Sequence, residues 1–294
     1  MAMSSDIFRT PAPDDRTAAG APAVRPRQRD VAKDSEVRAL ARHVSRAGAS
    51  QPFGAYIFHA DEPGAELARH VEHTVFLEAF GNTPDLLARE YGHYEASSMF
   101  ICVIDHLRGV PAGAMRVIHP SGAGFKSLND IEPVWGEPAA ALIERTGLAL
   151  DPRRTWDVAT IAVQEDYRGA ALGGLVSMGL YQTLTRAALG CGIDWFIAIL
   201  DMPVFRLIRW KLCMIFAGYA GVAPLPYLGS VASLPAWCDV VDAEQRLAER
   251  DATLHEILVC GRGLEAAMLP ADISAAERLA PEPRRYAAET GVSA

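Results

Sequence analysis

The chain has 294 residues, of which half are hydrophobic and 22% are charged, so wholesale disorder is excluded and a real core can be buried. Its five cysteines are far apart and form no CxxC pair, which argues against a disulfide scaffold or a structural zinc site and indicates a reducing, cytoplasmic location. The net charge of −8 divides into +3 over residues 1–50 and −11 over the rest, and such an acidic body argues against a nucleic-acid partner.

Residues 1–50 predict a flexible, disordered tail. Residues 10–30 are rich in Pro, Ala and charge and offer little apolar surface to bury. Residues 34–46 carry apolar side chains at helical spacing, which predicts one helix that is mobile or loosely docked. A single folded domain is therefore expected over residues 51–294.

From residue 54 onward, short apolar runs alternate with helical patterns. The predicted elements, in chain order, are a strand at 54–60, helices at 66–80 and 84–94, an antiparallel hairpin with strands at 97–105 and 111–119, a helix at 137–146, a strand at 155–163, a helix at 172–189, a strand at 193–200 and a helix after Pro203. The strand–helix–strand unit beside the hairpin predicts a mixed central sheet flanked by helices. The fold class is therefore α/β or α+β in one domain.

Residues 212–238 carry no charge, and a stretch of this length raises the question of a membrane span. Pro224, Pro226 and Pro235 interrupt it, and repeated prolines would break a lipid-embedded helix. We therefore expect no stable membrane insertion, but buried strands and loops that wall an apolar cavity. An ordinary apolar core is the alternative.

The most informative segment is VATIAVQEDYRGAALGG, residues 158–174. An apolar strand ends at Val163, and small residues then open a helix, where backbone N–H groups can approach an anion closely. Arg168 adds a positive charge. The segment thus predicts a phosphate or pyrophosphate cradle, and it matches neither a Walker loop nor a GxGxxG fingerprint. The cradle residues are Arg168, Gly169, Ala170, Ala171, Leu172, Gly173 and Gly174.

This run, from Arg168 to Gly173, resembles the acyl-CoA loop of the GNAT acyltransferase superfamily; an ordinary strand–helix turn is the alternative. The resemblance implies a splayed mixed sheet, with acyl-CoA or acyl-carrier protein as co-substrate and no permanently bound cofactor. It also implies that the thioester carbonyl lies against a backbone N–H around Ile161–Val163. Pantetheine would then run between the strands at 155–163 and 193–200.

The upstream segments are similar to the autoinducer-synthase and N-acyl amino acid synthase branch of that superfamily. They are Val75-Phe76 on a helix, the acidic pair Glu90 and Glu95, the strand ending Gly113-Ala114-Met115-Arg116, and Asp157 opening the next strand. The sequence departs from that branch at Gly92, where the acidic cluster has an Asp, and at Thr160, where an Arg is common. Ile208 lies near the position where superfamily members often have a Tyr acid.

Three residues are the catalytic candidates. Asp157 is expected to steer or deprotonate an ammonium substrate, or else to pair with Arg116 or Arg154. Glu90 lies five residues from Glu95, so both face one ligand only if the helix ends between them. Arg116 is expected to form a structural ion pair that also shapes the acceptor site.

Other patterns give weaker indications. Arg206, Arg209 and Lys211 form a basic patch that could receive CoA phosphates or an acidic carrier protein, or remain a solvated face. His70 and His73 lie three apart on a helix, but no third ligand is spaced to join them, so no metal is assigned. No covalent nucleophile is assigned either, since there is no Gly-x-Ser-x-Gly elbow.

Together these features predict an N-acyltransferase. It would move an acyl group of medium or long chain from acyl-CoA or acyl-carrier protein to an amine or amino acid. One alternative is a non-catalytic sensor or scaffold of the same fold that binds an acyl thioester. The other is an acyl-homoserine-lactone synthase, which the altered acidic cluster disfavours.

Overall fold

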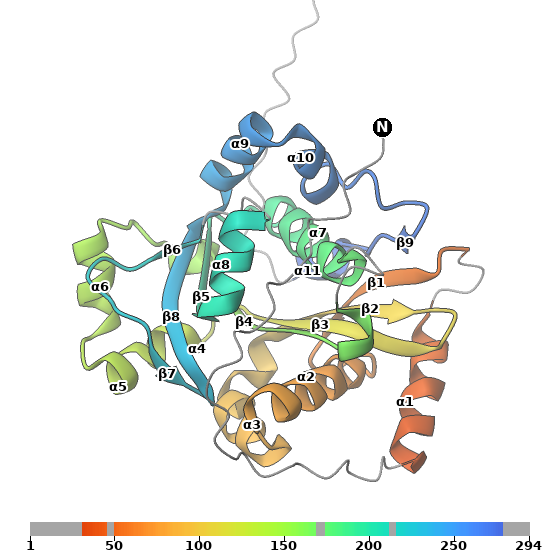
Figure 1. Ribbon diagram of the computed structural model, residues 1–294. Coiled ribbons are helices and arrows are strands. Elements are labelled where there is room, and N and C mark those ends of the chain that lie inside the picture. Colours follow the sequence, from red (N-terminus) through yellow and green to blue (C-terminus); the bar gives the residue numbers. More distant parts are fainter. Residues whose placement is uncertain (1–30, 46–49, 169–173, 212–215, 279–294) are drawn as a thin grey trace, which may run out of the picture.

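The computed structural model describes residues 31–45, 50–168, 174–211 and 216–278 (Figure 1). The helices are α1 (Val31–Val44), α2 (Ala65–Phe80), α3 (Pro84–Tyr91), α4 (Lys126–Asn129), α5 (Ile131–Trp135), α6 (Ala139–Thr146), α7 (Leu175–Gly190), α8 (Met202–Lys211), α9 (Val240–Arg250), α10 (Ala252–Leu258) and α11 (Ser274–Glu277), with 3₁₀ turns η1 (Gly92–Ser97), η2 (Pro152–Arg154) and η3 (Glu165–Tyr167). The strands are β1 (Phe53–His59), β2 (Ser98–Asp105), β3 (Val110–Ile118), β4 (Thr155–Val163), β5 (Trp195–Asp201), β6 (Ala217–Gly218), β7 (Leu225–Tyr227), β8 (Ser230–Asp239) and β9 (Met268–Leu269).

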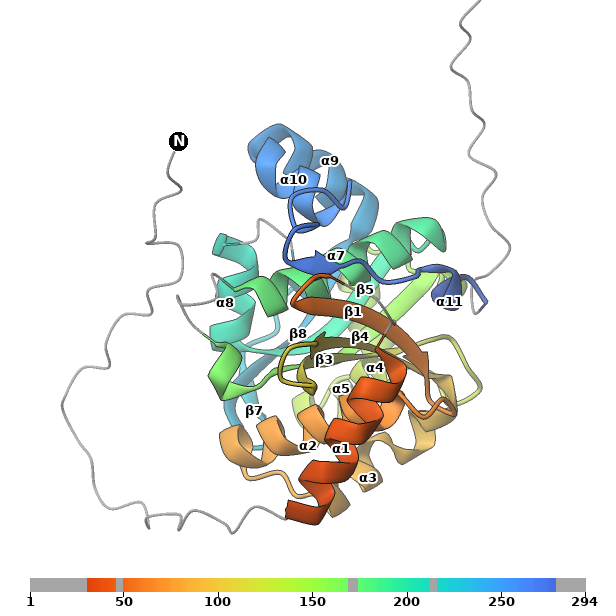
Figure 2. The same cartoon turned by 90° about the vertical axis from the view of Figure 1, so that its right-hand side faces the viewer.

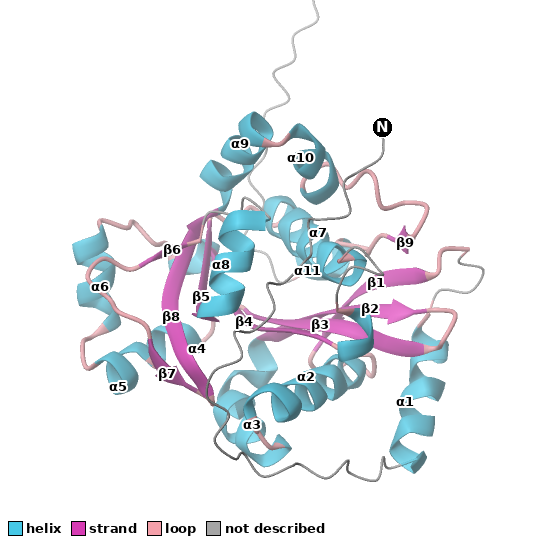
Figure 3. Ribbon diagram, in the orientation of Figure 1, coloured by secondary structure: helices cyan, strands magenta, loops and turns pink. Residues whose placement is uncertain are grey.

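All of these strands belong to one mixed sheet with the order β6-β8-β5-β4-β3-β2-β1-β9, and β7 pairs with β8 (Figure 3). Strands β1 to β4 form an antiparallel meander, β5 lies parallel to β4, and β8 returns antiparallel to β5. The fold class predicted from the sequence is confirmed. The predicted strand at 155–163 coincides with β4.

The pairing of β4 with β5 is short. Only Thr155, Trp156 and Asp157 are in register with β5, and the rest of β4 continues to Val163 beside β3 alone. A register shift between Arg116 and Val117 of β3 leaves Ala159 as an extra residue in β4, which is a β-bulge. The sheet therefore opens between β4 and β5 toward their carboxyl ends.

Helices cover both faces of the sheet. Figures 1 and 2 show α7 on one face and α1 and α2 on the other. One core cluster joins the buried face of α7, including Val176 and Leu180, to the sheet. A second joins Leu67 and Val71 of α2 to Phe100 of β2. Burial on both faces fixes the strands because any slip in register would turn apolar side chains outward.

The first 50 residues differ in part from the expected tail. Helix α1 packs beside α2, and Ala41 is fully buried in the same cluster as Leu67 and Val71. The apolar spacing of this segment therefore reflects a packed face. Residues 1–30 and 46–49 lie outside the described residues.

The described part of the uncharged stretch, residues 216–238, forms strands and connecting turns, as expected from its prolines. Residues 216–238 contribute β6, β7 and most of β8. Strand β8 pairs with β5 on one side and with the short strands β6 and β7 on the other. Tyr219 packs with Ile131 and Leu142 under the α4–α6 segment. Across the described ranges, no helix combines the length and apolar character that crossing a bilayer needs.

Candidate active site

A cavity of about 90 Å³ lies where β4 and β5 separate. It receives side chains from both faces of the sheet, since Phe76 and Phe80 come from α2 while Tyr181 and Leu184 come from α7. The other lining residues are Tyr91, Met115, Val158, Ala159, Thr160, Ile161, Ile199, Leu200, Asp201, Val204, Ile208, Phe216, Tyr227, Leu228, Ser230 and Ser233. The cavity is therefore mostly apolar, and the predicted apolar wall from the 212–238 stretch contributes to it.

The backbone of β4 presents polar groups to this opening. The Gln164 N–H donates to the Ala112 carbonyl at 3.0 Å, which fixes the antiparallel alternation between β3 and β4. By that alternation the N–H groups of Ile161 and Val163 face away from β3, toward the side that β5 has left. Ile161 also lines the cavity. The two backbone donors predicted from the sequence thus lie at the opening.

Arg168 is exposed at the end of this strand. Its Nε donates to the Val163 carbonyl at 2.6 Å, so the guanidinium lies beside the carboxyl end of β4. Gly174 precedes α7 in a left-handed conformation with φ 73°, which a glycine adopts without steric cost. The other predicted cradle residues (Gly169, Ala170, Ala171, Leu172 and Gly173) lie outside the described residues.

Arg116 lies at the centre of a buried ion network. Its guanidinium donates from Nη2 and Nε to the two oxygens of Glu72 at 2.7 and 3.1 Å, and from Nη1 to Glu95 at 2.7 Å. Glu95 also binds Arg69. Burial alone would lower the pKa of Arg116, but the two carboxylates outweigh it and raise the pKa. Arg116 is therefore fully engaged in a structural ion pair, which agrees with the sequence expectation.

Glu72 is a residue that sequence reasoning missed. Its side chain is only 2% exposed on α2, and besides Arg116 it accepts a hydrogen bond from Thr160 Oγ1 at 2.7 Å. Thr160 follows the bulge and lines the cavity. One carboxylate thus joins α2 to both β3 and β4, and the helical pattern of α2 alone gave no sign of this role.

Glu90 and Glu95 belong to different clusters because α3 ends at Tyr91 and a 3₁₀ turn follows. Glu90 binds the Lys126 ammonium at 2.8 Å, and Lys126 binds Asp130 at 2.5 Å. Burial lowers the pKa of Lys126, but hydrogen bonds to Asp130 and Glu90 outweigh that effect and raise it. The structure therefore gives Glu90 a structural partner and does not bring it together with Arg116.

Asp157 is fully buried at the closed end of the opening. It accepts hydrogen bonds from the Ser127 N–H at 2.8 Å and the Ser127 hydroxyl at 2.6 Å. The expected ion pairs with Arg116 or Arg154 do not form, because Arg116 binds Glu72 and Arg154 binds Asp194. Burial raises the pKa of Asp157 to about 6, although the Ser127 hydrogen bonds act in the opposite direction. These hydrogen bonds join the start of α4 to β4.

Asp201 is the one carboxylate among the residues that line the cavity. It ends β5 at the open end of the splay, and Ser230 Oγ donates to it at 2.6 Å. Sequence reasoning missed it because an Asp after a buried strand has no distinguishing motif. Its carboxylate is therefore part of the cavity lining, together with the hydroxyl-bearing side chains of Tyr91, Tyr181 and Tyr227.

No family model and no curated protein matches this sequence. Among solved structures, the chain is similar to the CoA-dependent acyl-homoserine lactone synthase BjaI, solved with SAM and isopentyl-CoA. The identity is 14% and the TM-score 0.49, over 77% of this chain and 99% of that one. It is also similar to FeeM, an N-acyl amino acid synthase from uncultured soil microbes, at 15% identity and TM-score 0.48, over 66% of this chain and 93% of that one.

A third similar structure, from Desulfovibrio desulfuricans, is assigned to the GNAT-family acetyltransferases, at 16% identity and TM-score 0.39, over 64% of this chain and 99% of that one. These three are the kinds of protein that the sequence resemblance named. At such identities the likeness concerns the fold.

Removing Glu72 should destabilise the protein severely. Glu72→Ala leaves the Arg116 guanidinium buried with part of its charge uncompensated, and we expect a loss of about 3–5 kcal/mol in the free energy of unfolding. Glu66→Ala is the matched control on the same helix, since its carboxylate is 66% exposed and pairs with Arg69; its loss should stay below ~1 kcal/mol. Urea unfolding measures both, and equal losses would contradict the structural role of the network.

Asp157→Asn should change how stability depends on pH. The folded-state pKa of about 6 lies above the ordinary 3.8, so the folded protein retains a proton that the unfolded chain releases between these values. Wild-type stability therefore falls as pH rises through about 6. Asn cannot ionise, and the variant should gain up to ~3 kcal/mol relative to wild type between pH 4 and pH 7.

The control for this measurement is Asp151→Asn. A side-chain hydrogen bond from Arg153 lowers the pKa of Asp151, so this group is already ionised throughout that range. Its difference from wild type should stay constant above pH 4. Parallel stability curves for wild type and Asp157→Asn would show that Asp157 is not the buried, proton-retaining carboxyl described above.

Proposed function

We propose that this protein transfers an acyl group from a thioester to an amine. The observation that carries the proposal is the apolar cavity at the β4–β5 opening, with the N–H groups of Ile161 and Val163 on the edge of β4 that faces away from β3. A thioester with an acyl chain on one side and an amide-bearing pantetheine arm on the other complements such a site. The acyl chain enters the cavity, and the arm lies along the β4 edge.

The backbone N–H of Ile161 or Val163 stabilises the transition state. When an amine attacks the thioester carbonyl, its oxygen becomes an oxyanion, and one fixed donor lowers such a barrier by roughly 3 kcal/mol. The β4 donors are held by pairing with β3, so they need no rearrangement during the reaction. In this proposal Ile161 and Val163 bind the thioester part of the acyl donor, and Arg168 binds its anionic end.

Asp201 receives the proton. The amine nitrogen forms the C–N bond to the carbonyl carbon, the tetrahedral intermediate collapses with cleavage of the C–S bond, and the proton lost by nitrogen passes to the Asp201 carboxylate and then to the departing thiolate. Ile208 lines the cavity where related enzymes often place a Tyr acid. A thiol of pKa ~8.5 leaves as the thiolate, so the step needs no separate acid.

The substrates are an acyl-CoA or acyl-carrier-protein donor and an amine or amino-acid acceptor. The extent of the apolar lining favours medium or long acyl chains over acetyl, because each buried methylene contributes ~0.8 kcal/mol. Side chains of both α7 and α2 line the cavity, so an acyl chain that enters it meets apolar groups from both faces of the sheet. No permanently bound cofactor takes part in this reaction.

The expected chain-length preference can be shifted by filling the cavity. Ser233 is buried in its wall, so Ser233→Leu should lower kcat/KM for long-chain donors by about tenfold or more while sparing short ones. Val231→Leu is the control, since Val231 lies on the same strand and is 86% exposed. A larger residue at Gly229 is unsuitable for this test. Gly229 has a φ of +82°, and an added Cβ would lie 2.4 Å from the Phe80 carbonyl, so the substitution would disrupt the turn.

The measurement is free-thiol release with C2 to C14 acyl-CoA and acyl-carrier-protein donors against a panel of amines and amino acids. Binding of acyl thioesters with no thiol released under any pairing would identify a sensor instead of an enzyme. A series that peaks at acetyl, unchanged by Ser233→Leu, would remove the long-chain assignment and leave the fold intact.

Asp201→Asn tests the proton acceptor. The amide keeps the shape and the Ser230 hydrogen bond, so folding should be retained while kcat/KM for the amine falls by about 10²-fold or more. Asp166→Asn, a surface change with the carboxylate 65% exposed, should leave both folding and kcat/KM unchanged, and wild-type kinetics in Asp201→Asn would assign the proton to another group.

A further inference from the structure

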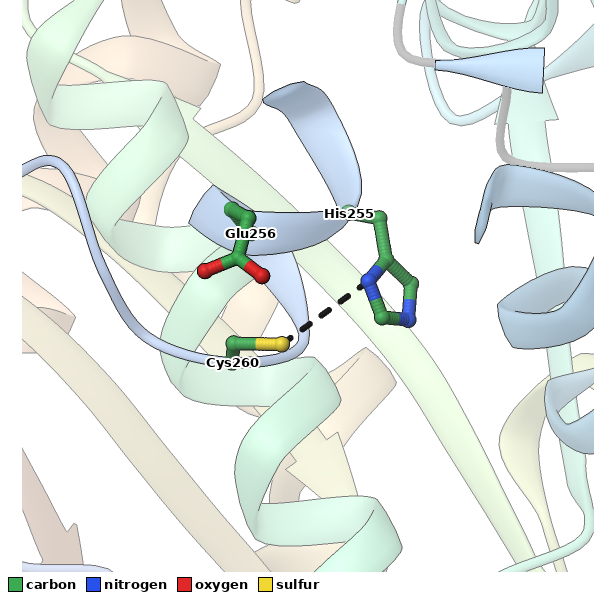
Figure 4. A group of neighbouring side chains, drawn as sticks. All are labelled: His255, Glu256 and Cys260. Atoms are coloured by element: carbon green, nitrogen blue, oxygen red, sulfur yellow. Dashed lines mark hydrogen bonds between the residues drawn. The ribbon is translucent and has the colours of Figure 1, made fainter. Parts of the chain in front are cut away.

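A cluster of three chemically different ligand groups lies outside the acyl cavity, at the end of α10. His255, Glu256 and Cys260 each place one ligand atom within 4.8 Å of the other two (Figure 4). Cys260 Sγ lies 3.8 Å from His255 Nδ1. Among the described residues, His255, Glu256 and Cys260 form the group whose ligand atoms lie close enough together to bind one metal ion.

The backbone brings these side chains together without help from an ion. The Cys260 N–H donates to the His255 carbonyl at 3.2 Å, and the Arg262 N–H donates to the Glu256 carbonyl at 2.9 Å. Gly261 follows with φ 72° and turns the chain back. The closing turn therefore folds Cys260 back beside the last turn of α10, which the spacing H-E-x-x-x-C does not reveal in the sequence.

A second carboxylate orients the imidazole. Glu244 of α9 lies 3.2 Å from His255 Nε2. A carboxylate only accepts, so Nε2 carries the proton and the lone pair of Nδ1 faces the Cys260 thiol. A histidine ligand held from behind by a carboxylate is the usual arrangement in metal sites.

We propose that His255 Nδ1, Cys260 Sγ and one Glu256 oxygen bind a divalent transition-metal ion, with Zn²⁺ as the best match. In a tetrahedral zinc site, Zn–S of ~2.3 Å and Zn–N of ~2.0 Å place sulfur and nitrogen about 3.5 Å apart, close to the observed 3.8 Å. Glu256 also pairs with Arg262 through Oε2 at 3.1 Å, but both side chains are largely exposed and such pairs are weak. Oε1 can ligate while Oε2 keeps Arg262, and a water completes the shell.

The same three groups also resemble a thiol nucleophile with a histidine base and a carboxylate behind it. The Glu256 carboxylate beside the thiol favours the metal site over the nucleophilic thiol. A neighbouring negative charge opposes formation of a free thiolate, whereas a cation is stabilised by thiolate and carboxylate together. The bound ion would tie α10 to its closing turn and, through His255 and Glu244, to α9.

The test uses the full chain, freed of metal by chelation and kept reduced. Zn²⁺ competition against a chromophoric chelator should give one ion per chain, and Cys260→Ser and His255→Ala should each weaken binding by at least tenfold. Glu244→Gln should weaken it about tenfold through the orientation of His255. His93→Ala, an exposed histidine elsewhere, should leave binding unchanged.

Two further readouts separate the metal site from its alternatives. Co²⁺ in place of Zn²⁺ should give a thiolate charge-transfer band that Cys260→Ser abolishes, and Zn²⁺ should protect Cys260 from iodoacetamide. Absence of binding at equimolar Zn²⁺, or unchanged binding in both Cys260→Ser and His255→Ala, would overturn the proposal. Fast alkylation of Cys260 near pH 6, unaffected by Zn²⁺, would overturn it in favour of a nucleophilic thiol.

Discussion

The separation of β4 from β5 is the constraint on which the rest of this structure depends. Strands that stop pairing leave backbone N–H and C=O groups that need other partners. The carbonyl of Val163 finds one in Arg168, while Ile161 faces the cavity. If β4 and β5 continued to pair, β5 would supply these partners. The proposed thioester, with its apolar chain and its own amides, would supply contacts in place of the missing strand pairing.

An opened sheet must be held by something other than its hydrogen bonds. The buried pair of Glu72 and Arg116 does this, because Glu72 contacts β3 through Arg116 and β4 through Thr160. The bulge at Ala159 is what places Thr160 opposite Arg116. In this network the Arg116 guanidinium is paired with Glu72 and Glu95, so its visible contribution is to hold β3 and β4 against α2.

The sequence predicted the parts that depend on local patterns. The bounds of β4 follow from a β-branched apolar run, and the end of α2 follows from Gly81, which ends it in a left-handed conformation. The helix predicted over 84–94 instead ends at Tyr91, and a 3₁₀ turn follows. The sequence could not predict contacts across the sheet. Glu72 looked like one more polar residue on a helix, and the partner of Asp157 is a serine 30 residues earlier. Such pairings are set by topology and carry no local signal.

Two aspartates illustrate how register decides function where residue type cannot. Asp157 pairs with Ile197 at the closed end of the β4–β5 opening, whereas Asp201 lies four residues further along β5, about 13 Å away at ~3.3 Å per residue. At the closed end Asp157 and its partner Ser127 are both buried. Ligands in open sheets bind beyond the carboxyl ends of parallel strands, and β4 and β5 are parallel. In the proposed reaction, an amine that approaches a thioester lying on β4 therefore meets Asp201, whereas Asp157 hydrogen-bonds to Ser127 at the closed end.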